Sequence, residues 1–169
     1  MASVKEDVLA ALGALGIPYE LLEHAPVHTM EDCRAAEEAL GGVMPKNLFL
    51  TPRNHASHHL LIARAEAPFR TSRISRQLGV SRLSFATAEE LMEMLRTLPG
   101  AISPMGLLFD QERKVRLAID SALRGEERLL FHPCVNTATL AVSGADFFER
   151  LLPALGHEAT YVDMEEDAE

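Results

Sequence analysis

Short apolar runs and amphipathic helices follow one another irregularly along this chain, and this order most constrains its fold. Strands are predicted at Tyr19–His24, Lys46–Thr51, His59–Ala65, Leu83–Phe85, Met105–Phe109, Lys114–Asp120, Glu127–Phe131, Thr139–Ser143 and Tyr161–Met164. Helices are predicted at Ser3–Leu15, Thr29–Leu40, Thr71–Leu78, Ala88–Leu98 and Ala145–Leu155. Because the chain lacks regular strand–helix–strand alternation, we predict an α+β fold with a mixed, mainly antiparallel sheet flanked by helices.

The length of 169 residues fits one domain with a substantial core. We assign this domain to residues 1–164 and expect the acidic end, Glu165–Glu169, to fray. We find neither an apolar run of about 18 residues nor a secretory signal, so no membrane association is predicted. The two cysteines, Cys33 and Cys134, form no CxxC motif, which argues against a disulfide scaffold or structural zinc. These features predict a cytoplasmic protein.

The net charge of −9 is distributed unevenly. Residues 44–82 contain seven basic residues and one acidic residue, Glu66, so they carry +6 while the remainder carries −15. Arg70, Arg73 and Arg76 recur every three residues and are predicted to share one face of a helix, with Arg82 following. Such asymmetry can attract a polyanion to one face. Arginines that merely solvate a helix and its loops are the alternative interpretation.

Three short segments place polar or conformationally special residues at the ends of apolar runs: Pro45–Leu50, Gly100–Pro104 and Phe131–Thr137. Lys46 begins the first of these runs, where its stem can pack on apolar neighbours while its ammonium reaches the end of the sheet. An ordinary lysine at a sheet edge is the alternative that the residues alone leave open. Such strand ends favour a pocket.

The second and third segments show the same ambiguity. Pro104 fixes its own φ and biases Ser103 toward an extended conformation, so Gly100–Pro104 is predicted to be a rigid loop whose backbone lines a small pocket. A Gly-x-x-x-Pro sequence is also typical of an ordinary turn. His132 ends an apolar run, and a histidine at such a position has either a structural role or a role in a site.

In their order and spacing the three segments resemble the editing domains associated with prolyl-tRNA synthetase, the YbaK-like family, over nearly the whole chain. The continuation Met105–Leu108 and the His-Pro-x-x-Asn-Thr sequence that starts at His132 are closest to the freestanding deacylases of mischarged Ala-tRNA(Pro). The chain departs from the family at Phe109, where a polar residue usually precedes the aspartate at Asp110.

The resemblance implies a role for each segment. Lys46 would engage the acceptor end of the tRNA, and Asn47 would help to position it. The loop from Gly100 to Pro104, with Ser103, would hold the ribose and the amino group. His132 would shape the aminoacyl pocket. Asn136 and Thr137 would brace it.

The implied reaction is hydrolysis of the aminoacyl ester, assisted by the 2′-hydroxyl of the substrate and without a metal or other cofactor. An activated ester needs little beyond a positioned water and a donor for the developing oxyanion. Selectivity is expected to be steric, with Met30, Leu48 and Ile62 as apolar walls that admit alanine and exclude proline. The four arginines at positions 70, 73, 76 and 82 are expected to meet phosphates of the acceptor stem.

Other interpretations stay open. The substrate could be Cys-tRNA(Pro) or another small mischarged aminoacyl-tRNA, or the chain could be a non-catalytic tRNA-binding module of the same fold. Prolyl-tRNA synthetase is a further expected partner. The spacing of His55, His58 and His59 does not match a helical zinc motif, so these side chains are expected to face solvent. Cys134 is better explained as a packing residue than as a nucleophile.

Overall fold

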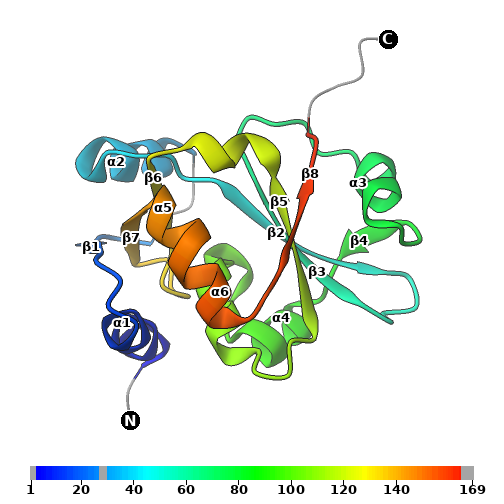
Figure 1. The fold of residues 1–169 in the computed structure, drawn as a ribbon, viewed down its shortest axis with the longest axis horizontal. Coiled ribbons are helices and arrows are strands. Elements are labelled where there is room, and N and C mark those ends of the chain that lie inside the picture. Colours follow the sequence, from blue (N-terminus) through cyan, green and yellow to red (C-terminus); the bar gives the residue numbers. More distant parts are fainter. Residues whose placement is uncertain (1–2, 27–29, 165–169) are drawn as a thin grey trace.

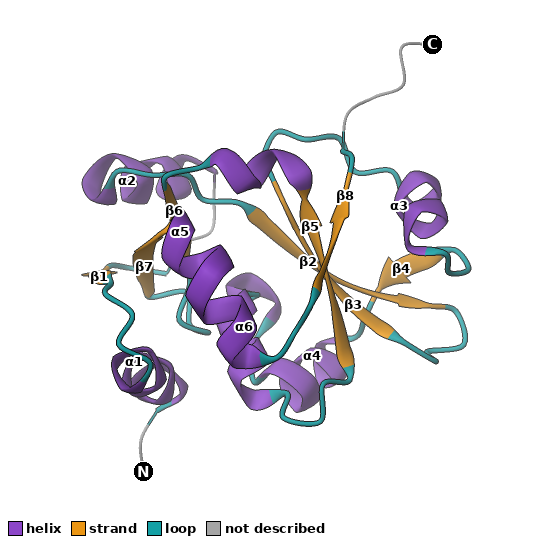
Figure 2. Cartoon of the chain, viewed as in Figure 1, coloured by secondary structure: helices purple, strands orange, loops and turns teal. Residues whose placement is uncertain are grey.

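The computed structural model describes residues 3–26 and 30–164, and its strands form two sheets (Figures 1 and 2). The smaller sheet is antiparallel and has the order β1 (Glu20–Glu23), β7 (Ala138–Ser143), β6 (Arg128–Phe131). The larger sheet has the order β4 (Leu83–Phe85), β2 (Lys46–Pro52), β3 (His58–Ala63), β5 (Val115–Asp120), β8 (Ala159–Val162).

The larger sheet is mixed. Strands β2 and β3 form an antiparallel hairpin in which Lys46 pairs with Ala63, and β4 pairs antiparallel with the other edge of β2. The pairs β3–β5 and β5–β8 are parallel. The predicted α+β class with mixed, mainly antiparallel pairing and flanking helices is confirmed, and the strands divide between two sheets rather than one.

The helices lie around these sheets (Figure 1). They are α1 (Val4–Ala14), α2 (Met30–Leu40), α3 (Thr71–Leu78), α4 (Ala88–Leu95), α5 (Gly144–Asp146) and α6 (Leu152–Leu155). A π-helical turn, Phe147–Leu151, joins α5 to α6, so the single helix predicted there is continuous but locally widened. Within the described part of the chain, no helix is long and apolar enough to cross a membrane.

Alternation along β2 separates two apolar layers. Phe49 packs into the main core together with Leu60 of β3 and Phe131 of β6. Leu50 points to the other face of the sheet, into a second cluster that contains Ile74 of α3. Because successive side chains of a strand alternate between faces, Lys46 and Asn47 at the start of β2 also lie on opposite faces. This alternation decides which of the two can line a pocket.

One predicted strand is wrong. Residues Pro104–Phe109 form a 3₁₀ helix instead of the strand predicted at Met105–Phe109. Pro104 supplies a helical φ at the first position, and the Ser103 hydroxyl accepts a hydrogen bond from the Met105 N–H at 3.1 Å. Apolar side chains bury this short helix, which is why a short apolar run was mistaken for a strand.

Smaller differences concern the ends of elements. The last strand, predicted at Tyr161–Met164, forms earlier, at Ala159–Val162. Thr29, predicted to begin the second helix, and the tail Glu165–Glu169 lie outside the described residues.

His59 contradicts the expectation that the hairpin histidines face solvent. Its side chain lies in β3, is 2% exposed and is hydrogen-bonded to the Ser57 hydroxyl through Nε2 at 2.9 Å. Burial, with smaller contributions from Arg116 and His58, lowers the pKa of His59 to about 4. The imidazole is therefore neutral in the folded protein near neutral pH.

This burial predicts acid sensitivity. Between about pH 6.5 and pH 4 the unfolded chain binds a proton at His59 and the folded chain does not, so the stabilisation is complete above pH 6.5 and is lost toward pH 4. The full contribution is up to about 3 kcal/mol. We expect urea unfolding at several pH values to give a shallower acid slope for His59→Gln than for the wild type. Identical slopes would contradict the assignment.

Candidate active site

The first and third sequence segments meet because two sheets join at one backbone bridge. The Val43 N–H donates to the Arg128 carbonyl at 3.1 Å, and the Leu130 N–H donates to the Val43 carbonyl at 2.9 Å. Gly42 permits this approach: its φ is 153°, and a Cβ there would lie 2.6 Å from the Leu130 side chain. The bridge places the start of β2 beside the end of β6.

A small cavity of about 160 Å³ lies at this junction. Side chains and backbone from α2, the segment before β2, the 3₁₀ turn Pro99–Ala101 and the end of β6 line it. The lining residues are Cys33, Met44, Pro45, Asn47, Pro99, Gly100, Ile102, Leu130, Phe131 and His132. Each of the three sequence segments therefore contributes to one cavity, and most of the residues that line it are apolar.

Asn47, one of the lining residues, carries an unpaired acceptor. Its Nδ2 donates to the Pro45 carbonyl at 3.5 Å, whereas its buried Oδ1 has no hydrogen-bond partner among the described residues. Leaving a buried acceptor unpaired costs about 1–3 kcal/mol. Such a group in a cavity wall indicates a ligand that donates a hydrogen bond.

His132 offers a second polar group with a defined proton position. Its Nδ1 lies 2.9 Å from the Ala138 carbonyl, which can only accept, so Nδ1 carries the proton. Burial lowers the pKa of His132 below its usual value; the bond to Ala138 opposes this, and the nearby His24 adds to it. In the neutral ring, Nε2 is then an acceptor.

His24, which directly follows β1, lies beside His132. Its ring centroid lies 6.4 Å from that of His132, with the two rings edge to face. The His24 Nδ1–H donates to the Ala25 carbonyl at 2.8 Å, and its Nε2 pairs with the Thr139 hydroxyl at 2.8 Å. These hydrogen bonds fix the orientation of the His24 ring, which packs against His132.

From the second segment, Gly100 and Ile102 line the cavity. A Cβ at Gly100 would meet only the Asn136 Nδ2, at 3.7 Å, which is ordinary contact, and the φ of Gly100 is not in the left-handed region. The backbone therefore does not require glycine there. Ser103 and Pro104 are buried and start the following 3₁₀ helix without lining the cavity.

Lys46 lies at the same end of β2 but on the opposite face. Its ammonium donates to the carbonyl of Ala67, in the loop that leads to α3, and the lysine does not line the cavity. Leu48 follows it on that face, at the second apolar cluster. Ile62, which pairs with Asn47, is buried in the main core behind the cavity.

The remaining residues predicted to bind the substrate differ in where they lie. Asn136 lies beside Gly100 and is half-buried, whereas Thr137 is exposed and its carbonyl accepts from the His24 N–H at 2.9 Å. The side chain of Met30 lies outside the described part of the structure. Of the residues expected to bind or act on the substrate, the cavity thus brings together Asn47, Gly100 and His132.

Several lining residues were missed. Cys33 lies on α2 three residues before the buried Ala36, so helical periodicity could have placed it on the inner face. Met44, Leu130 and Phe131 resemble ordinary core residues in the sequence, and only the bridge between the sheets turns them into a cavity wall.

Cys134 is confirmed as a packing residue. Its side chain belongs to the main core, and its φ is 62°. Burial raises the pKa of Cys134 to about 12, with Arg96 opposing this weakly. The thiol therefore stays protonated at neutral pH, which argues against a thiolate nucleophile.

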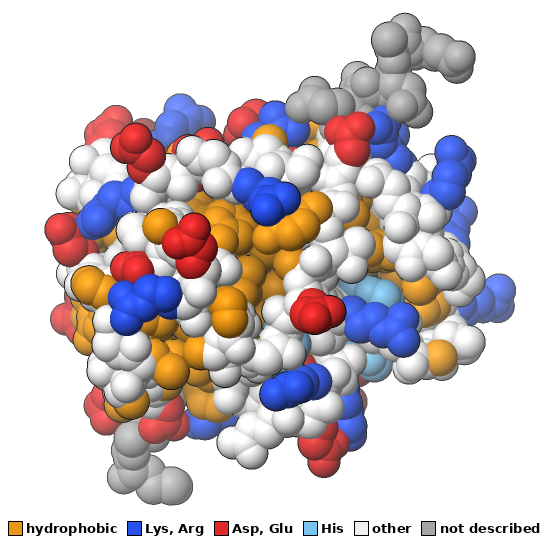
Figure 3. Space-filling model, in the orientation of Figure 1, with side chains coloured by type: hydrophobic (Ala, Val, Ile, Leu, Met, Phe, Trp, Pro, Cys, Tyr) orange, Lys and Arg blue, Asp and Glu red, His pale blue; other side chains and the backbone are white. Residues whose placement is uncertain are grey.

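Two of the arginines expected to share a helical face, Arg73 and Arg76, lie three residues apart on α3. Arg70 precedes the helix in extended backbone, and Arg73 is paired with Asp163 at 3.1 Å. Arg76 and Arg82 are exposed. Figure 3 shows Lys and Arg side chains near α3.

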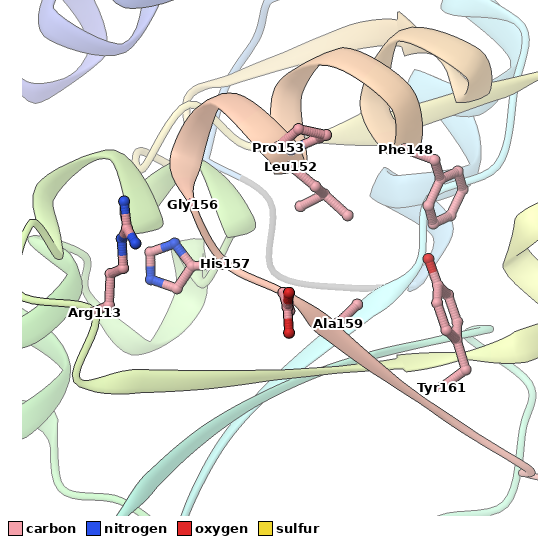
Figure 4. A pocket seen from close by; sticks show the side chains of 9 residues that line it. Arg113, Phe148, Leu152, Pro153, Gly156, His157, Ala159 and Tyr161 are labelled. Carbon is pink, nitrogen blue, oxygen red and sulfur yellow. The ribbon is translucent and has the colours of Figure 1, made fainter.

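A larger hollow lies elsewhere. It measures about 720 Å³ and lies between α6 and β8 (Figure 4). Phe148 and Tyr161 stand at one side of it, and Arg113 and His157 at the other. None of the residues expected to act on the substrate lines it, so we assign the candidate active site to the smaller cavity.

Comparisons with known proteins identify the family of the chain. The family model described as the aminoacyl-tRNA editing domain matches residues 24–149, a span that contains all three segments. The chain is 31% identical over 160 residues to the prolyl-tRNA editing protein ProX of Acetoanaerobium sticklandii, covering 95% of this chain and 97% of that relative. It is also 31% identical to the prolyl-tRNA synthetase associated domain-containing protein 1 of Mus musculus, covering 93% and 94% of the two chains.

Solved structures agree on the fold. The crystal structure of a candidate trans-editing enzyme for prolyl tRNA synthetase matches with a TM-score of 0.74 at 19% identity, over 99% of both chains. The resemblance found in the sequence is therefore confirmed. The chain belongs to the aminoacyl-tRNA editing domain family, on its prolyl-tRNA editing branch, and is an enzyme of the aminoacyl-tRNA deacylase class.

Proposed function

We propose that this chain hydrolyses the ester of mischarged Ala-tRNA(Pro), freeing alanine and the tRNA. The observation that carries the proposal is the unpaired Oδ1 of Asn47, a residue that lines a small cavity among mostly apolar residues. An α-ammonium group is a donor that such an oxygen can accept from. In this proposal Asn47 binds the ammonium that all amino acids share, and the apolar lining residues contact the amino-acid side chain.

The size of the cavity favours a small side chain. Pockets for drug-sized ligands measure about 300–1,000 Å³, so a cavity of about 160 Å³ suits an aminoacyl group and leaves the adenosine outside. A synthetase pocket built for proline rejects the smaller alanine weakly. A second pocket that admits alanine and excludes the pyrrolidine ring supplies the missing discrimination.

The ester requires little chemical assistance. In this proposal Asn47 holds the ammonium, the backbone of the Gly100 loop lies against the ribose, and the neutral His132 accepts a hydrogen bond from a ribose hydroxyl through Nε2. The 2′-hydroxyl orients the attacking water, so positioning and oxyanion stabilisation account for the catalysis. We assign no proton transfer to His132.

Lys46 acts from outside the cavity. Its ammonium lies on the basic side of the sheet, at the carbonyl of Ala67, three residues before Arg70. In the proposal it exchanges this carbonyl for a phosphate or ribose oxygen of the acceptor end, with Arg70 and Arg73 beside it. Arg76 and Arg82, both exposed, meet phosphates further along the stem.

Two further candidates have support. Cys-tRNA(Pro) is the closest competitor, because the sulfhydryl adds little volume and the cavity wall is apolar. A non-catalytic tRNA-binding module is favoured by one observation, the ammonium of Lys46 held away from the cavity. The proposal also places the protein in the cytoplasm, where charged tRNA is made, with prolyl-tRNA synthetase as the enzyme whose errors it corrects.

Asn47→Ala tests the proposed ammonium contact. We expect kcat/KM for Ala-tRNA(Pro) to fall about 10- to 100-fold, because a hydrogen bond to a charged group contributes about 1.5–3 kcal/mol. Unlike most buried polar substitutions, this one removes an unpaired acceptor, so the free energy of unfolding should be little changed. Single-turnover deacylation and urea unfolding measure the two quantities.

The matched control is Asn54→Ala, in the loop between β2 and β3, where the amide oxygen caps the Ala56 N–H and lies away from the cavity. It should leave deacylation unchanged. Full activity of Asn47→Ala would contradict the assignment of the pocket. If activity is lost because the variant does not fold, the urea unfolding curve will show the loss of stability.

Lys46→Ala distinguishes an enzyme from a non-catalytic tRNA-binding module. We expect deacylation of Ala-tRNA(Pro) to fall at least tenfold at subsaturating substrate, because the acceptor end loses its positioning cation. A catalytically silent module would show no hydrolysis above buffer in the wild type, and the substitution would then change only the affinity for tRNA.

Charge reversal tests the tRNA footprint. Arg76→Glu and Arg82→Glu together should weaken binding of uncharged tRNA and reduce the dependence of log Kd on log salt concentration, because each lost phosphate contact removes about 0.7–0.9 from that slope. Arg53→Glu, exposed in the hairpin loop, changes the net charge by as much as either single reversal and is the control for each of them. Equal weakening by the control would indicate a general charge effect and would contradict the footprint.

A further inference from the structure

A second cluster of chemically capable side chains lies away from the cavity. His55 and His58, from the hairpin that joins β2 to β3, converge on Glu90 of α4. The His55 Nδ1 lies 3.1 and 3.0 Å from the two carboxylate oxygens, and the His58 Nε2 is hydrogen-bonded to Oε2. One donor atom from each of the three residues lies within 4.8 Å of the other two.

The hairpin holds its two histidines in place. His55 adopts a left-handed φ of 54° and donates its N–H to the Pro52 carbonyl at 2.9 Å, which closes the turn. His58 is the first residue of β3, and its ring stacks on Phe49 with centroids 5.7 Å apart. The orientation of both rings is therefore set by backbone and packing as well as by the carboxylate.

Helix α4 fixes the carboxylate. Glu90 belongs to a capping box in which its Oε1 accepts from the Thr87 N–H at 3.0 Å while the Thr87 hydroxyl accepts from the Glu90 N–H at 3.1 Å. With Oε1 held by the backbone, Oε2 faces the histidines. Metal-ligating carboxylates are commonly oriented by such a second hydrogen bond.

From this geometry we propose that His55, His58 and Glu90 bind a divalent transition-metal ion of the Zn²⁺ type, with water at the remaining position. Two imidazole nitrogens and one carboxylate oxygen are a donor set that Zn²⁺ takes, at about 2.0–2.2 Å. Tetrahedral donors at these lengths lie about 3.4 Å apart, so the present spacing requires shifts of about 1 Å or less.

Solvent can reach the site. The side chain of His55 is 50% exposed, that of Glu90 19% and that of His58 14%. An ion can therefore enter from water and keep a water ligand, while His58 and Glu90 are shielded enough to strengthen binding.

The site is distinct from the active site. Leu50 of β2 pairs with His59, and in this antiparallel hairpin His58 lies one position further from Asn47. The distance along β2 between Asn47 and the position of His58 is therefore about four residues, or about 13 Å. A bound ion would cross-link the β2–β3 hairpin to α4, because its ligands come from both elements. Any ligand that binds only the folded chain raises its stability, so Zn²⁺ should stabilise this protein.

The test uses the full chain, stripped of metal with a chelator and dialysed, and titrated with ZnCl₂. We expect one ion per chain by isothermal titration calorimetry and a rise in Tm of about 5–10 °C at a hundredfold excess over Kd. CoCl₂ should give the visible absorption of a low-symmetry, four-coordinate ion.

Matched variants identify the ligands. Glu90→Gln keeps an oxygen for the capping box but removes the charge, and should weaken Zn²⁺ binding at least tenfold. Glu89→Gln makes the same change one residue earlier, at an exposed position outside the cluster, and should bind as the wild type does. His55→Gln, in the exposed turn, is a second ligand variant that leaves the strand intact.

The outcomes separate the proposal from an ordinary ion-pair cluster. If ZnCl₂ neither shifts Tm nor binds stoichiometrically, the three side chains form a metal-free network and the proposal is overturned. Equal Zn²⁺ binding by Glu90→Gln, His55→Gln and the wild type would also overturn it, because the ion would then sit elsewhere. Circular dichroism of each metal-free variant confirms that it is folded.

Discussion

The candidate active site depends on the backbone bridge between Val43 and β6. Two hydrogen bonds, from Val43 to the Arg128 carbonyl and from Leu130 to the Val43 carbonyl, hold the edge of one sheet to the start of the other. Gly42 lets the chain approach closely enough to make them. Without this bridge the polar residues at the start of β2 and after β6 would have no common cavity, because their strands belong to different sheets.

The bridge produces a site that has few reactive groups but holds them in fixed positions. The described residues around the cavity offer an unpaired amide oxygen and a neutral imidazole, set in an apolar wall. This combination suits a reaction in which the substrate brings its own activated ester and its own hydroxyl group. Selection by size and by one hydrogen bond then decides which ester is cleaved.

The sequence predicted much of this arrangement. Periodicity identified most helices and strands, and the Gly100 and His132 segments fall at the cavity as the family resemblance implied. The 3₁₀ helix after Pro104 was missed because a short buried apolar run has the same composition in a strand and in a tight helix. The direction of Lys46 was also missed, since alternation tells which residues share a face but not which face meets the cavity.

The histidine cluster shows a different limit. His55 and His58 lie three residues apart, but their acidic partner, Glu90, lies more than thirty residues further along the chain. Local spacing therefore gave no sign of the contact, which arises only when α4 packs beside the hairpin. Sequence motifs detect sites whose ligands are close in the chain, and this one is assembled by the fold.

The central claim is that the cavity between the two sheets selects alanine attached to tRNA(Pro). The most direct measurement is single-turnover hydrolysis of Ala-tRNA(Pro), Cys-tRNA(Pro) and Pro-tRNA(Pro) by the wild-type chain under identical conditions. The account predicts rapid release of alanine, with proline released no faster than in buffer. Hydrolysis of Pro-tRNA(Pro) at a comparable rate, or no acceleration for any of the three esters, would contradict it.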